Sequence, residues 1–187
     1  MNRLNYIVLV ASIFIINACG YYSMAGSSIP PHIKNIAIPL VNNQTAEFGI
    51  AESITDNIIE VFNEENILNI VDERNADSIL RGTIISLEDA PYTYNSAEAV
   101  SEYRINITMD ITWNDVSNDV DLLKKKYSGW GAYGLSGDIN TDGIDNDGDG
   151  KIDEEDDDEF GEPRSFATKI AITKIAEDVV NSILTSW

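Results

Sequence analysis

The sequence is poor in the residues on which most catalytic and nucleic-acid-binding sites depend. Its 187 residues include one cysteine, one histidine and 12 lysines and arginines, against 32 aspartates and glutamates. A formal charge of −20 excludes the broad basic face that binding to nucleic acid phosphates requires. The sequence contains no nucleophile motif and no phosphate-binding glycine loop, and a single histidine offers little acid–base chemistry. We therefore expect neither an enzyme nor a nucleic-acid-binding protein.

Long hydrophobic runs are also missing, apart from one at the N-terminus that ends just before the cysteine. Residues 6–16 follow the basic Arg3 and form an apolar stretch too short to span a bilayer comfortably. Residues 16–20 read Ile-Asn-Ala-Cys-Gly, a pattern typical of a bacterial lipobox. It predicts a signal peptide over 1–18 and a lipidated Cys19 that anchors the chain permanently in the outer membrane. A stray thiol beside a leader is the alternative.

The mature chain is expected to consist of a short tether and one domain. Residues 19–33 are polar-aromatic and contain prolines, which predicts an extended, lipidated tether. Residues 34–187 form the domain, and an apolar content of 43% suits a single folded core. Hydrophobic residues at a period of two predict strands at 35–41, 67–72, 78–89, 101–115 and 122–133. Periods near 3.6 predict helices at 46–66 and 162–187.

The strongest patterns also predict which side chains form the core. In the strand 101–115 the apolar set is Tyr103, Ile105, Ile107, Met109, Ile111 and Trp113. The stripe of the first helix is Ile50, Ile54, Ile58, Val61 and Phe62. The stripe of the last helix is Phe166, Ile172, Ile175, Ala176, Val179, Ile183 and Trp187. In the first strand, Ile36, Ile38 and Leu40 share one face, and Pro39 indicates an edge or a strand end.

These patterns predict the fold class. A strand that alternates apolar and polar residues has one covered and one polar face, which is typical of an antiparallel sheet. Two helices with one apolar stripe each can cover a single face of such a sheet. We therefore expect an α+β fold, a two-layer sandwich with both helices on one face of a mostly antiparallel four- or five-stranded sheet.

An acidic segment, residues 137–162, interrupts the passage from the last strand to the last helix. Between 138 and 162 it holds thirteen acids and one lysine. It fits the ligand pattern of a calcium loop, with acids at places 1, 3, 5, 9 and 12 and glycine at place 6. The pattern is filled by Asp145, Asp147, Asp149, Gly150, Asp153 and Asp156, with the backbone carbonyl of Lys151 at place 7.

A second copy of this pattern begins seven residues earlier and shares Asp149 with the first. It comprises Asp138, Asn140, Asp142, Gly143, Asn146 and Asp149. Place 12 holds aspartate rather than the glutamate of an EF-hand, and the run resembles the calcium repeats of thrombospondin type 3. We expect calcium as a structural cofactor, with one or two ions. A solvated acidic linker is the alternative.

Three stretches of the mature chain resemble the LptE family of lipopolysaccharide-assembly lipoproteins. They are "GYYSMAGSSIPPHIKNIAIPLVNNQT" directly after Cys19, "NIVDERNADSILRGTI" over 69–84 and "KIAEDVVNSILTSW" at the C-terminus. Their order and spacing carry the resemblance, which covers most of 19–134 and 163–187. The chain departs from the family at the acidic segment, where the family has a short connection.

The resemblance implies a small α+β sandwich without catalytic chemistry that plugs the lumen of a large outer-membrane β-barrel, LptD. Together the two proteins insert lipopolysaccharide into the outer leaflet. An LptD-like barrel and lipopolysaccharide are therefore the expected partners, and the domain would face the periplasm or lie within the barrel lumen. No basic residue here matches a family motif for lipopolysaccharide contact. The basic run Lys124, Lys125 and Lys126 is a candidate for that contact, with a solvated strand or turn as the alternative.

Two other function classes stay open at this point. A calcium-dependent surface or adhesion lipoprotein would make the acidic segment the functional part of the chain. An enzyme would need a positioned nucleophile or acid–base pair, whereas the clustered carboxylates indicate a bound cation rather than a bond to be cleaved.

Overall fold

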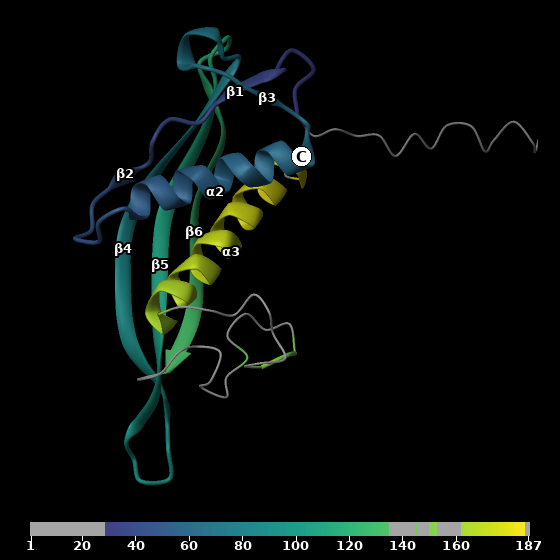
Figure 1. Ribbon diagram of the computed structural model, residues 1–187. Coiled ribbons are helices and arrows are strands. Elements are labelled where there is room, and N and C mark those ends of the chain that lie inside the picture. Colours follow the sequence, from purple (N-terminus) through teal and green to yellow (C-terminus); the bar gives the residue numbers. More distant parts are fainter. Residues whose placement is uncertain (1–28, 135–144, 146–149, 153–161, 186–187) are drawn as a thin grey trace, which may run out of the picture.

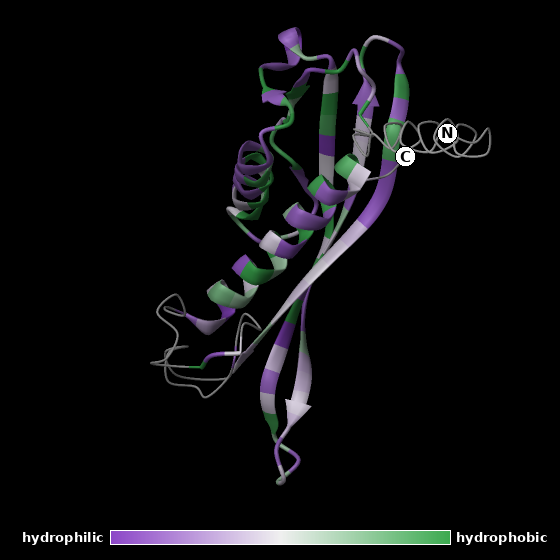
Figure 2. Ribbon diagram, turned by 90° about the vertical axis from the view of Figure 1, so that its right-hand side faces the viewer, coloured by the Kyte–Doolittle hydropathy of each residue, from purple (hydrophilic) through white to green (hydrophobic). Residues whose placement is uncertain are grey.

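Two helices lie on one face of a long, twisted sheet and leave the other face uncovered (Figure 1, Figure 2). This computed structural model describes residues 29–134, 145, 150–152 and 162–185. The predicted leader, Cys19, most of the tether and most of the acidic segment lie outside the described residues. The predicted fold class, a two-layer α+β sandwich with both helices on the same side, is confirmed.

The sheet is mixed but mostly antiparallel, as predicted. Three long strands, β4 (Ser78–Tyr94), β5 (Val100–Asp115) and β6 (Val120–Gly134), form an antiparallel meander. The short strands β1 (Asn35–Ala37), β2 (Asn42–Asn43) and β3 (Asn69–Ile70) pair in parallel. In the part of the chain that is described, the order is β3–β1–β4–β5–β6, with β2 beside β4. The sheet has six strands because the expected strand 35–41 gives rise to two short ones.

The first expected strand breaks at Pro39, and one of its predicted core residues is exposed as a result. Proline has no backbone N–H to give to a neighbouring strand, so β1 ends at Ala37. Ile36 is fully buried, but Leu40 is 61% exposed, which contradicts the predicted shared face. The chain returns to the core at Val41, whose N–H donates to Thr55 Oγ1 at 3.1 Å.

The two helices follow the predicted stripes closely. Helix α2 (Ile50–Glu65) begins after Gly49, which has a φ of 77° that favours glycine. It buries Ile50, Ile54, Ile58 and Phe62 of the predicted stripe, and Val61 packs against the core. Helix α3 (Pro163–Thr185) buries every predicted stripe residue up to Ile183. A 3-10 turn, η2 (Glu73–Asn75), precedes β4. No helix in the described ranges is long and apolar enough to cross a membrane.

Helix α3 packs directly on the backbone of β6. A methyl group on Gly129 would lie 2.0 Å from the carbonyl oxygen of Ala171, and one on Gly131 would lie 2.2 Å from that of Ala167. Both distances are far shorter than van der Waals contact, so these two positions require glycine. The alternate residues of β5, from Ile105 to Trp113, are buried on the same side, as the sequence predicts.

The N-terminal end of the described chain belongs to the core. Ile29 and Ile33 are both buried and are part of the main hydrophobic cluster. Between them, His32 Nε2 lies 2.7 Å from Oδ2 of the buried Asp115 at the end of β5. The packed domain therefore includes residues that the sequence assigned to the tether, and it begins before the predicted boundary at residue 34.

Candidate functional site

The uncovered face of the sheet, called the open face below, has the composition of a binding surface rather than of a core. It consists of the side chains of β4–β6 that alternate with the buried ones. On β5 these are Arg104, Asn106, Thr108, Asp110 and Thr112, and on β6 they are Lys124, Lys126, Ser128, Trp130 and Ala132. β4 contributes Arg81, Thr83, Ser86, Glu88, Ala90 and Tyr92. The face is therefore polar, with aromatic side chains towards one end.

The strand alternation separates the three lysines that the sequence offered as a lipopolysaccharide contact. Lys124 pairs with Thr112 and Lys126 with Asp110, so both side chains lie on the open face. Lys125 is opposite the buried Ile111 and lies on the helix side, with its Nζ 5.0 Å from the ring centroid of Tyr127. The structure thus brings Lys124 and Lys126 to one surface and places Lys125 on the other.

A cluster that the sequence analysis missed lies on the same face, formed by Tyr92, Arg104 and Trp130 from three adjacent strands. The Arg104 guanidinium lies 4.2 Å from the Trp130 ring centroid and 5.6 Å from that of Tyr92. The two rings are in contact, with centroids 5.9 Å apart. The sequence offered one signal, namely that Arg104 and Trp130 occupy polar positions of two predicted neighbouring strands. Recognising the cluster from this signal would have required the register of β5 and β6.

Arg104 has no acidic partner among the described residues, although the chain is strongly acidic. None of the ion pairs formed within the described ranges includes it. Its Nε is buried, and its N–H donates no hydrogen bond within the described part of the chain. A guanidinium held only by aromatic rings keeps most of its capacity to donate hydrogen bonds to an anion.

By contrast, Arg164 at the start of α3 is fully occupied by carboxylates. It donates two hydrogen bonds of 3.0 Å to Glu47 and one of 3.0 Å to Asp89. These bonds raise the pKa of Arg164 and lower the pKa of Glu47. Burial, together with Asp89, which accepts from the Tyr133 hydroxyl, raises the pKa of Tyr133 to about 12. This network joins the loop before α2, β4, β6 and α3, and it is structural.

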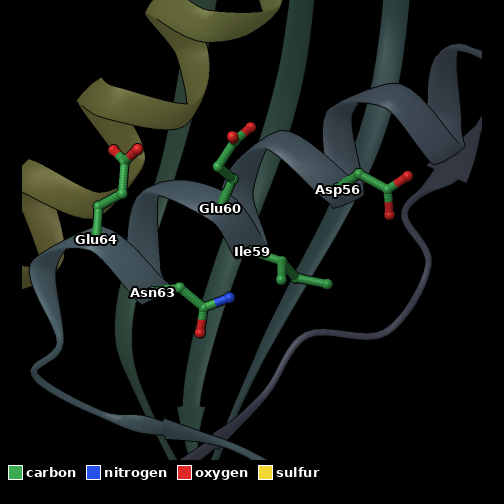
Figure 3. Close-up of a pocket in the computed structure, with 5 residues that line it drawn as sticks. All are labelled: Asp56, Ile59, Glu60, Asn63 and Glu64. Atoms are coloured by element: carbon green, nitrogen blue, oxygen red, sulfur yellow. The ribbon is translucent and has the colours of Figure 1, made fainter.

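The outer side of α2 carries a shallow, acidic hollow of about 620 Å³ (Figure 3). It is lined by Asp56, Ile59, Glu60, Asn63 and Glu64. The three acids are spaced four residues apart and therefore repel one another on the helix surface. The helix contains no basic residue. The outer side of α2 is thus negative, whereas Arg104, Lys124 and Lys126 lie on the open face.

Three of the residues assigned to the predicted calcium loops are described, and two of them, Asp145 and Gly150, make a contact typical of such a loop. The Gly150 N–H, at place 6, donates to Asp145 Oδ2, at place 1, over 3.0 Å. Gly150 has a φ of 94°, which requires glycine. Lys151, at place 7, is exposed. Cys19 lies outside the described residues. So do the other predicted calcium ligands, which are Asp138, Asn140, Asp142, Asn146, Asp147, Asp149, Asp153 and Asp156.

Solved structures of bacterial proteins share this fold. CT253 from Chlamydia trachomatis has a TM-score of 0.53 at 9% identity, over 83% of this chain and 99% of that one. XCC0632 from Xanthomonas campestris has a TM-score of 0.53 at 8% identity, over 81% and 83%. Lipoprotein B from Nitrosomonas europaea has a TM-score of 0.50 at 8% identity, over 82% and 84%. At these identities the likeness concerns the fold alone. No curated protein sequence matches the chain.

A family comparison covers nearly the whole domain. Residues 33–186 match the LptE family, whose description is lipopolysaccharide assembly. The match begins at the buried Ile33 and includes β1–β6 and both helices, so it coincides with the packed part of the structure. The family resemblance inferred from the sequence is confirmed. The chain therefore belongs to the LptE family and has a role in lipopolysaccharide assembly.

Proposed function

We propose that this protein is a non-catalytic outer-membrane lipoprotein, anchored through Cys19, that joins a large LptD-like β-barrel in assembling lipopolysaccharide. The family match over 33–186 carries this proposal. The fold is compatible with it, because one whole face of the sheet is left without a covering layer (Figure 2). A partner that surrounds the domain would cover that face.

The shape of the sheet supports an enclosing partner. The hairpin of β4 and β5 extends well beyond the ends of both helices (Figure 1). Its side chains Tyr92 and Tyr94 are 45% and 62% exposed. Large aromatic side chains that are half exposed on a regular hairpin are typical of contact surfaces. We propose that the end of this hairpin, at Tyr94, reaches into the partner.

The test is affinity purification of the full-length, tagged chain from detergent-extracted outer membranes. Co-purification of a large β-barrel protein together with lipopolysaccharide is the expected result. Recovery of the chain alone would contradict the proposal. If the chain alone also bound whole cells only when calcium was present, the alternative of a calcium-dependent surface or adhesion module would be favoured instead.

We also propose that the acidic segment binds one or two calcium ions that stabilise the connection between β6 and α3. The hydrogen bond from Gly150 to Asp145 supports this, since it draws places 1 and 6 of the first loop together. Titration calorimetry of the full chain should detect calcium. Asp149→Asn, which removes a charge from both loops, should weaken binding by about tenfold or more. Asp157→Asn removes the same charge outside either pattern and is the matched control. Absence of a heat signal at millimolar calcium would end this idea.

A further inference from the structure

The cluster of Tyr92, Arg104 and Trp130 has no evident role in holding the fold together. It lies on the open face, opposite the helices that bury the core, and both aromatic side chains remain 45% exposed. On β4 and β6, the direct neighbours of Arg104 are the small Ala90 and Ala132. Tyr92 on β4 and Trp130 on β6 are the next open-face residues beyond these two alanines. Because the alanines are small, the two aromatic rings can meet beside the Arg104 guanidinium.

A cation in this position is poorly compensated by the protein alone. Burial of the Arg104 Nε without a hydrogen bond has a cost that the ring faces offset only in part. The nearest acids of the two strands do not relieve it. Glu102 accepts a hydrogen bond of 2.6 Å from Thr93, and neither Glu102 nor Glu88 forms an ion pair with Arg104 among the described residues.

The cluster has the chemical groups that an anionic ligand would bind. The planar guanidinium can donate two parallel hydrogen bonds to a phosphate, and the rings hold its plane in one orientation before the ligand arrives. Exposed tyrosine and tryptophan rings beside it offer flat apolar surfaces, and hydroxyl and amide groups follow along the same face at Asn106, Thr108 and Ser128. A flat ring surface next to a phosphate-binding cation suits a phosphorylated sugar.

The charge of the face agrees with this ligand. Lys124 and Lys126 lie further along β6 on the same side, whereas the outer side of α2 presents only acids. The open face carries Arg81, Arg104, Lys124 and Lys126 against the acids Glu88 and Asp110, so an anionic ligand would meet net attraction there and repulsion along the outer side of α2.

We propose that Tyr92, Arg104 and Trp130 form a binding site for the phosphorylated saccharide part of lipopolysaccharide. Arg104 binds the phosphate, and the exposed rings pack against the adjoining sugar. This rests on the proposed function, because it names the surface through which the protein would contact its lipid partner.

The experiment measures equilibrium binding of the full-length protein, in detergent, to purified lipopolysaccharide, to its dephosphorylated form and to inorganic phosphate. Arg104→Gln should weaken binding of the phosphorylated lipid by about tenfold, with a much smaller effect on the dephosphorylated form. Trp130→Leu should weaken binding of both lipid forms. Inorganic phosphate should compete only at far higher concentration than lipopolysaccharide, since it lacks the sugar.

Arg81→Gln is the matched control. Arg81 is on the same face of β4 but is already paired with Glu73 at 3.0 Å, so Arg81→Gln should weaken binding far less than Arg104→Gln. The unfolding midpoint of each variant establishes that it is folded. If Arg104→Gln or Trp130→Leu does not fold, the milder variants Arg104→Lys and Trp130→Phe replace them. Folded variants that bind as tightly as the wild type would overturn the inference, as would an equal loss for both lipid forms on Arg104→Gln. If the wild type itself bound no lipopolysaccharide, the proposed function would fail first.

Discussion

A single buried carboxylate determines how the N-terminal end of the domain is held. Asp115 is 2% exposed and accepts hydrogen bonds from His32, from the Asn118 side chain and from the Ser117 N–H. Burial alone would raise the pKa of the Asp115 carboxyl, but these hydrogen bonds outweigh it and hold the pKa below its ordinary value of 3.8. The last residues before β1 are therefore joined to the β5–β6 turn through a charge.

This charge makes the stability of the domain depend on pH. Because the folded carboxyl has the lower pKa, its stabilisation is present in full above about pH 4 and is lost as the pH falls below that value. The free energy of unfolding should therefore decline below about pH 4. Asp115→Asn should make that decline shallower and reduce stability at neutral pH by roughly 1–3 kcal/mol. Denaturant unfolding between pH 7 and pH 2.5 measures both effects.

Asp56→Asn is the comparison for that experiment, since Asp56 is exposed on α2 and forms no described hydrogen bond or ion pair. It should leave both the neutral stability and the acid slope unchanged. An acid slope that is the same in Asp115→Asn and the wild type would show that other carboxylates govern the decline, such as Asp77, whose pKa is lowered by hydrogen bonds from the N–H groups of Lys34 and Asn35.

The three adjacent lysines of β6 offer a comparison within one run of sequence. Lys124 and Lys126 lie on the open face and Lys125 on the helix side, so only the first two can meet a ligand there. Charge reversal at Lys124 and Lys126 together should lower lipopolysaccharide binding severalfold and make the remaining binding less sensitive to added salt. Lys125→Glu should have a much smaller effect. Equal effects of all three reversals would indicate a general charge effect instead of a surface.

At the scale of elements, the contact between α3 and β6 depends on two glycines. Gly129→Ala and Gly131→Ala would each place a methyl group inside the backbone of α3, which must then move away from the sheet. Each variant should be destabilised by at least about 2 kcal/mol, because the close packing of the core leaves no room for the displacement. Chemical denaturation measures this. Ser128→Ala, on the open face between them, should stay within about 0.5 kcal/mol of the wild type.

The elements themselves could be predicted wherever a single periodicity extended over many residues. The alternation from Tyr103 to Trp113 and the stripe from Ile50 to Phe62 are set by burial against one neighbouring layer, so the pattern predicts the structure. The strand at 35–41 could not be predicted in full, because Pro39 ends the pairing while the apolar spacing continues to Leu40. The burial of Ile29 and Ile33 in the core could not be predicted either, because they are two isolated apolar residues in a polar, proline-bearing segment.

The candidate site was harder to predict because it arises between strands. Tyr92 and Trp130 are separated in sequence by a hairpin and a third strand, and they meet only because Arg104 lies between them in the established register. The lysine run could be found from the sequence, but its division between two faces required the pairing of Lys125 with Ile111. For the acidic segment, Gly150 donates its N–H to Asp145 Oδ2, and the calcium ligand set predicted from the spacing stays a prediction.

For the whole molecule, the main expectation concerns where it resides. Cys19→Ala removes the acceptor for the lipid, so the protein should disappear from the outer-membrane fraction on a sucrose gradient and should no longer incorporate labelled palmitate. Ser23→Ala, a neighbouring change that leaves the lipobox intact, should behave as the wild type. Unchanged outer-membrane recovery of Cys19→Ala would refute the anchor.

The direct packing of α3 on β6 also makes the molecule suitable for engineering. Gly134 ends β6 and Glu162 precedes α3, and the spacing of these two elements is determined by the backbone contacts at Gly129 and Gly131. Between fixed ends, doubling the length of a connecting segment adds only about 0.6 kcal/mol of closure entropy. A foreign peptide or a reporter domain could therefore be grafted at this point, and the scaffold would carry it to the site of lipopolysaccharide assembly as a probe of that compartment.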